Sequence, residues 1–101
     1  MSPMQVLLID YDLKSEPHTD RSKDYAALEE TIRQHSMGTY ERGLHSQFFV
    51  FSPMPIVNWH GHIRQSPGWR NGDEVTIVQL QPGSASGDIP ARVLGWVARS
   101  A

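Results

Sequence analysis

A short apolar segment near the N-terminus constrains the fold of this chain more than any other feature. Residues 4–13 read MQVLLIDYDL, with β-favouring residues in the middle of the segment. The segment is too short for a well-defined helix, and its apolar residues occupy both faces of an extended strand. This pattern is typical of a central strand, so we predict that these residues lie inside a sheet rather than at its edge.

The segments that follow alternate between helix and strand patterns. An apolar stripe at helical spacing predicts a helix over residues 24–36, and β-favouring residues predict two strands over 39–44 and 46–52. A weaker helical stripe covers residues 56–63, and a β-branched run predicts a strand over 73–81. The order β-α-β-β-α-β predicts an α+β ferredoxin-like sandwich, with a four-stranded antiparallel sheet and both helices on one face.

The length of 101 residues predicts a single domain over residues 1–101. Residues 82–90 (PGSASGDIP) are expected to form a flexible linker. Residues 91–101 form a tail that alternates only roughly, as a short strand or a helical turn would; we predict an additional strand at a dimer or partner interface. No apolar stretch is long enough to span a membrane, and no signal-peptide pattern or cysteine is present, so we expect a cytoplasmic protein.

Charge is distributed unevenly along a chain whose net charge is only −2. Residues 1–41 contain eight acidic and four basic side chains, a balance of −4, whereas residues 42–101 contain three acidic and five basic side chains, a balance of +2. Such a composition excludes a strongly basic nucleic-acid-binding surface but allows a local face that binds anions.

Two aspartates at the end of the first predicted strand are candidate metal ligands. Asp10 and Asp12 are two residues apart, so on a strand they share one face at a separation of about 6.5–7 Å. Mg²⁺ prefers oxygen ligands such as one or two carboxylates, and a bound Mg²⁺ could activate water for phosphodiester cleavage. The alternative is that acidic residues at a strand end simply face solvent.

The second half of the chain contains a candidate nucleic-acid-binding surface. Arg64 and Arg70 lie near Trp59 and Trp69, and single-strand binders combine basic side chains with aromatic rings that stack on bases. Packing in the core or at a dimer interface is the alternative role for these rings. His60 and His62 suggest zinc, but side chains two residues apart diverge on a helix, and further ligands are missing from the pattern.

Several short motifs occur in an order and spacing that resemble the SinR-like group, which is similar to the CRISPR-associated Cas-two family and, more distantly, to virulence-associated protein D. The matching residues are Tyr11-Asp12, Asp24-Tyr25 with Leu28 and Ile32, Ser46 with Phe48, and Gly72-Asp73-Glu74. The resemblance implies a small ferredoxin-like protomer that forms a homodimer, often with a C-terminal strand that extends the partner's sheet. Some members of the family are metal-dependent nucleases, in which the catalytic aspartate would correspond to Asp12, and others are non-catalytic scaffolds.

Two functional hypotheses follow. The first is a non-catalytic dimeric protein-interaction module of the Cas-two or SinR-like type, associated with nucleic-acid or defence systems. The second is a metal-dependent endonuclease that uses Asp12, helped by Asp10, with Mg²⁺ as cofactor. The acidic N-terminal half, the nearly neutral net charge and the lack of an evident general base favour the interaction module.

Overall fold

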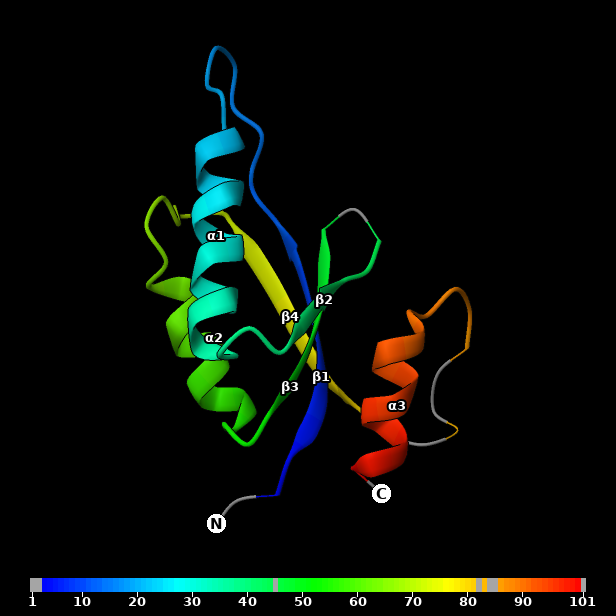
Figure 1. Ribbon diagram of the computed structural model, residues 1–101. Helices are drawn as coiled ribbons and strands as arrows, with labels where there is room; N and C mark the ends of the chain where they lie inside the picture. The colour runs from blue at the N-terminus through cyan, green and yellow to red at the C-terminus, as the bar shows by residue number, and fades with distance from the viewer. Residues whose placement is uncertain (1–2, 45, 82, 84–85, 101) are drawn as a thin grey trace.

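The computed structural model describes residues 3–44, 46–81, 83 and 86–100 (Figure 1). In this part of the chain the strands are β1 (Gln5–Asp12), β2 (Tyr40–Arg42), β3 (Gln47–Ser52) and β4 (Glu74–Leu80), and the helices are α1 (Ser22–His35), α2 (Ile56–Arg64) and α3 (Ala91–Arg99). The prediction of an α+β protein with a four-stranded antiparallel sheet is confirmed, and the architecture is compatible with a small ferredoxin-like fold.

The strand order is β2-β3-β1-β4, so β1 has a neighbour on each side, as its two apolar faces predict. Both neighbours run antiparallel to β1, and Ile9 lies opposite Phe48 on β3 and Ile77 on β4. The two edge strands differ in length, since β2 has three residues and β4 has seven.

The larger core cluster joins the sheet to α1 and α2. Alternate residues of β1 point to this side, and they pack against helix residues spaced three or four apart. The buried members of the cluster are Leu7, Ile9, Tyr11, Leu13, Leu28, Ile32, Phe48, Val50, Trp59 and Ile63. The few polar groups among these side chains are satisfied: the Trp59 indole Nε1 donates to the Ser52 hydroxyl at 3.3 Å.

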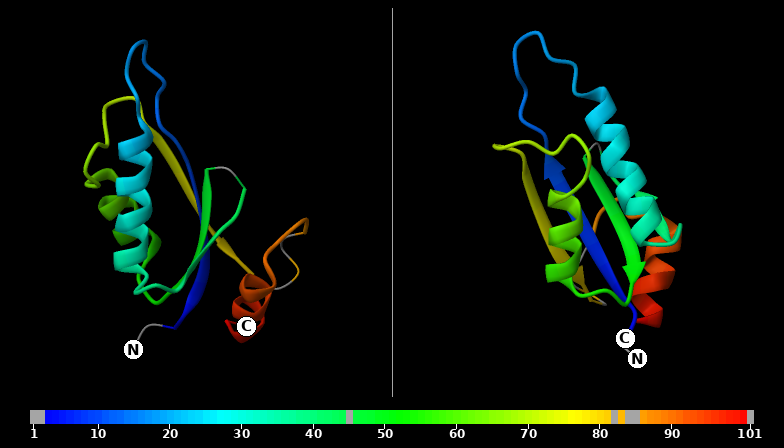
Figure 2. Two further views of the ribbon diagram at one scale, coloured as in Figure 1. Left: turned by 45° about the horizontal axis from the view of Figure 1, so that its top comes forward. Right: turned by 90° about the vertical axis from the view of Figure 1, so that its left-hand side faces the viewer.

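The C-terminal tail forms a helix, so the prediction of an additional strand is wrong. α3 lies on the other side of the sheet from α1 and α2 (Figures 1 and 2). Its Val93 and Trp96 are three residues apart, and both are buried against the sheet in a second cluster with Val6, Phe49 and Leu80. The Trp96 ring stacks on Phe51 at a centroid distance of 5.7 Å, and burial of this large ring favours the helical spacing over the alternation of a strand.

The segment that connects β4 to α3 is only partly described. Three residues of the predicted linker, Pro82, Ser84 and Ala85, lie outside the described residues. Ile89, at its end, packs against the α3 cluster. No helix in the described part of the chain is both long and apolar enough to cross a membrane.

Candidate functional site

The two predicted aspartates lie on the sheet face that α3 covers further along the strands. Asp10 and Asp12 are both exposed, while Tyr11 between them points into the core. Asp12 lies opposite Glu74 on β4, and the three carboxylates line a shallow hollow of about 190 Å³. The described residues nevertheless contain no group of three or more histidine, cysteine or acidic side chains arranged to hold a metal ion.

The two predicted arginines lie in different surroundings. Arg64, on α2, lines a groove of about 340 Å³ that runs between α2 and β4. Arg70 follows α2 in the chain, and its guanidinium lies 3.4 Å from Glu16 and 3.8 Å from Asp24. Acidic neighbours therefore offset much of the charge that Arg70 would otherwise offer to a phosphate.

The two histidines of α2 diverge, as expected for a helix. His60 lines the groove beside Arg64, whereas His62 stacks on His35 of α1 at a ring-centroid distance of 3.8 Å. Partial burial, followed by the charge of His62, lowers the pKa of His35 from its usual value. The sequence pattern gave no sign of this pair, because its two members are 27 residues apart and meet only where α1 and α2 pack together.

A buried arginine joins the two long loops at one end of the sheet. The Nε of Arg21 donates to Asp24 at 2.6 Å, and its two terminal nitrogens donate to the two oxygens of Asp73 at 2.9 and 2.7 Å. The same nitrogens also donate to the backbone carbonyls of Lys14 and Gly68. All five N–H groups of the guanidinium thus have an acceptor, which is the condition for burying this charge at low cost.

Asp73 is the counterpart of Arg21 in this cluster. Its side chain is fully buried, and its oxygens also accept the backbone N–H groups of Lys14 and Arg70, both at 2.8 Å. These bonds, above all those from Arg21, lower the pKa of Asp73 to about 2. The Arg21–Asp73 pair is therefore a structural clamp, in which every hydrogen-bonding group is occupied by the protein itself.

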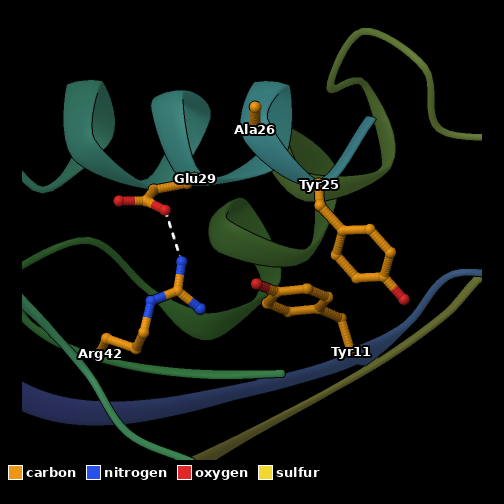
Figure 3. A pocket seen from close by; sticks show the side chains of 5 residues that line it. All are labelled: Tyr11, Tyr25, Ala26, Glu29 and Arg42. Atoms are coloured by element: carbon orange, nitrogen blue, oxygen red, sulfur yellow. Dashed lines mark hydrogen bonds and ion pairs between the residues drawn. The ribbon is translucent and has the colours of Figure 1, made fainter. Parts of the chain in front are cut away.

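A cleft of about 330 Å³ lies between α1 and the sheet (Figure 3). Tyr25, Ala26 and Glu29 of α1 line one side, and Tyr11 and Arg42 line the other. Arg42 donates to Glu29 at 2.5 Å across the cleft. Pockets that combine apolar walls with a few converging polar groups are the usual location of small-molecule sites.

The electrostatics of the cleft are set by burial and by this ion pair. Burial raises the pKa of Tyr11 to about 12, an effect that the nearby Arg42 only partly opposes. The Tyr11 phenol consequently stays protonated at neutral pH and can donate a hydrogen bond. The charges of Glu29 and Arg42 cancel, so the cleft is polar but has no net charge.

Comparison with known proteins does not place this chain in a family. No family model matches the sequence, and neither the curated proteins nor the solved structures contain a significant match. The resemblance to the SinR-like group and the Cas-two family therefore stays a prediction.

Proposed function

We propose that this protein is a non-catalytic, dimeric protein-interaction module that assembles through the free edge of β4. The observation that carries the proposal is the exposed character of this edge strand. β4 pairs with β1 on one side, and within the described residues no strand pairs with it on the other. A seven-residue edge presents a row of backbone donors and acceptors that a further strand can pair with.

The two edges of the sheet differ in how well they are protected. β2 is three residues long and contains the charged residues Glu41 and Arg42, which discourage pairing. β4 has the sequence EVTIVQL, with no lysine, arginine or proline, and its Val78 side chain is 42 % exposed. Apart from the charged Glu74 at its start, β4 therefore lacks the devices by which monomeric proteins usually protect a long edge.

A second copy of the chain is the partner that the β4 sequence fits best. In an antiparallel pair centred on Ile77, Thr76 would lie opposite Val78 of the second copy, and Glu74 would lie opposite Leu80. This register places no two like charges opposite each other and brings β-branched residues together, which stabilises cross-strand pairs. The groove beside β4, lined by His60, Arg64 and Trp69, lies where side chains of an added strand could dock.

The proposal also includes the finer assignment of the fold. The element order β1-α1-β2-β3-α2-β4, the strand order β2-β3-β1-β4 and the shared core of α1 and α2 support a ferredoxin-like domain to which α3 is added. Membership of the SinR-like or Cas-two type, with its association with nucleic-acid or defence systems, is proposed on the motif order alone. A cytoplasmic location is proposed on the composition, which includes no cysteine.

Sedimentation equilibrium of the full chain and of a charged β4 variant tests the assembly. We expect the unmodified chain to have twice the monomer mass, and the double variant Thr76→Lys/Val78→Lys to be a monomer. In the proposed register each new lysine would face a lysine of the second copy. Within one chain the change is tolerable, because Thr76 lies opposite Asp10 and both substituted side chains are exposed.

The matched control is Met37→Lys/Val57→Lys, which adds the same charge at two exposed apolar positions away from β4. This control should remain a dimer. A monomeric unmodified chain, or a dimer that persists in the β4 variant, would rule out assembly through this edge. Deletion of residues 91–101 is a poor test, since it would uncover the core that Val93 and Trp96 close.

A metal-dependent endonuclease is the second proposal, and it rests on the shared hollow of Asp10, Asp12 and Glu74. If it holds, cleavage of RNA or DNA requires Mg²⁺, stops with EDTA and is lost in Asp12→Asn but not in Asp88→Asn. Equal activity of the two variants, or cleavage that EDTA does not affect, would contradict it. The three acidic side chains would repel a nucleic acid unless an ion were bound, which makes this the weaker of the two proposals.

A further inference from the structure

The cleft beneath α1 is large enough to hold one ring system. Its volume of about 330 Å³ is at the lower end of small-molecule sites, which span roughly 300–1,000 Å³. Ala26 contributes only a methyl group to the α1 side, so the helix does not fill the space above the Tyr11 ring (Figure 3). A larger side chain at this position would close the cleft.

Aromatic rings held in place by their own packing form the walls. Tyr11 is 4 % exposed, so only a small part of it borders the cleft, and its ring lies nearly parallel to Phe48 with a centroid distance of 6.0 Å. Tyr25 lies 6.0 Å from Tyr11 at an angle of 43°, so the two rings are inclined to each other along the cleft. Rings that are already ordered lose little conformational entropy when a ligand packs against them.

The polar groups of the cleft combine acceptors and donors side by side. The Glu29 carboxylate accepts from Arg42 and, at 3.4 Å, from the Tyr40 hydroxyl, and its two oxygens have further lone pairs. The Arg42 guanidinium carries five N–H groups, which only donate hydrogen bonds. Both side chains are accessible, with exposed fractions of 38 % and 52 %. A ligand edge that carries a donor next to an acceptor would match both groups at once.

We propose that this cleft binds a nucleobase, which packs against Tyr25 and the small accessible part of Tyr11 while Glu29 and Arg42 contact its hydrogen-bonding edge. The base could belong to a free mononucleotide or to single-stranded nucleic acid. Because the charges of Glu29 and Arg42 cancel, the base rather than the phosphate supplies the recognition. Guanine fits best, since its N1–H and N2–H groups can both donate to one carboxylate while its O6 accepts from arginine.

The proposal is independent of assembly through β4 and is tested by nuclear magnetic resonance on the full chain. Titration with guanosine monophosphate should give saturable amide shifts centred on Tyr11, Tyr25, Ala26 and Glu29. Adenosine, cytidine and uridine monophosphates should bind more weakly, and ribose 5-phosphate, which has no base, should give no shifts there. A single-stranded hexanucleotide containing one guanine distinguishes the sources: tighter binding than the mononucleotide indicates nucleic acid, and equal or weaker binding indicates the free nucleotide.

Two variants, each with a matched control, locate the site. Ala26→Leu fills the cleft and should weaken binding about tenfold or more, equivalent to about 1.4 kcal/mol, whereas Ala98→Leu on the exposed face of α3 should have no effect. Glu29→Gln should abolish the preference for guanine, and Glu30→Gln, the same change one residue further along α1, should retain it. Thermal unfolding of each variant checks that the fold is retained.

Several results would overturn the proposal. These are equal shifts from ribose 5-phosphate and the nucleotides, shifts centred away from the cleft, or an affinity that Ala26→Leu leaves unchanged in a folded protein. The absence of saturable shifts with every mononucleotide and with the hexanucleotide would equally exclude a nucleobase as the ligand of this cleft.

Discussion

Neutralising Asp73 should destabilise the protein far more than neutralising an exposed carboxylate. Asp73→Asn keeps the size of the side chain but removes the charge that faces the buried guanidinium of Arg21. The amide keeps one acceptor oxygen but presents a donor to one of the two Arg21 N–H groups that now donate to Asp73. Arg21, which is 6 % exposed, would then have Asp24 as its only carboxylate partner among the described residues.

Two independent arguments set the size of the effect. The folded-state pKa of Asp73 is about 2, against about 3.9 in an unfolded chain, and this difference corresponds to about 2.5 kcal/mol of stability at neutral pH. Removal of one partner from a buried ion pair typically costs about 3–5 kcal/mol. We therefore expect Asp73→Asn to lower the free energy of unfolding by about 2.5–4 kcal/mol at pH 7, a large part of the usual stability of a small domain.

Urea denaturation of both proteins from pH 7 to pH 2 measures this effect and its origin. Because the folded-state pKa is depressed, the stabilisation is fully present above the unfolded-state pKa near 4 and is lost as the pH falls toward 2. The difference between the unmodified chain and Asp73→Asn should therefore shrink over this interval. The control Glu41→Gln breaks the exposed pair with Arg92 and should cost less than about 1 kcal/mol.

Two results would refute the reasoning. A loss at pH 7 no larger than that of Glu41→Gln would show that the clamp contributes no more than a surface pair. A large loss that stays constant down to pH 2 would show that Asp73→Asn acts through packing rather than through the charge of the carboxylate.

Three further predictions concern packing, backbone conformation and pH. Trp96→Ala should cost about 3–5 kcal/mol in urea denaturation, because it empties the centre of the α3 cluster. Gly68→Ala should lower the melting temperature, since φ is +85° and an added Cβ would lie 2.1 Å from an oxygen of Asp24; Gly61→Ala, inside α2 with open space around it, should raise the melting temperature. The pKa of His35 is lowered in the folded state, so the unfolded chain binds its proton more readily and stability should fall as the pH drops through about 6.5. His35→Gln should flatten the stability profile measured between pH 5 and pH 8.

The elements that the sequence predicts are those whose packing is encoded by short-range periodicity. The run around Leu7 and Ile9 predicts a central strand, and the stripe of Leu28 and Ile32 predicts α1, because each pattern repeats within a few residues. The prediction of a strand over the α3 segment is wrong. Gly95 lies among the apolar residues of this short segment, so their helical periodicity is hard to recognise. Its helical form depends on the stacking of Trp96 on Phe51, which lies 45 residues earlier in the chain.

The candidate sites depend still more on contacts between distant parts of the chain. The clamp joins Arg21 to Asp73 across 52 residues, and Arg21 lies in a polar loop that has no period to indicate burial. The cleft likewise exists only where Glu29 of α1 meets Arg42 of β2. The spacing of Asp10 and Asp12 is enough to place both on one face of a strand. It does not predict that Glu74 lies opposite Asp12, because the register between two strands depends on contacts between distant parts of the chain.

The positions of the two proposed surfaces determine how they can work together. Arg42 of the cleft belongs to β2, and the strand order places β3 and β1 between β2 and the free edge of β4. Assembly through β4 would extend the sheet away from the cleft, so a dimer would carry two accessible clefts. The monomeric variant Thr76→Lys/Val78→Lys should therefore bind a mononucleotide as well as the dimer does. If this variant lost mononucleotide binding while remaining folded, the cleft and the dimer interface could not be the separate surfaces proposed here.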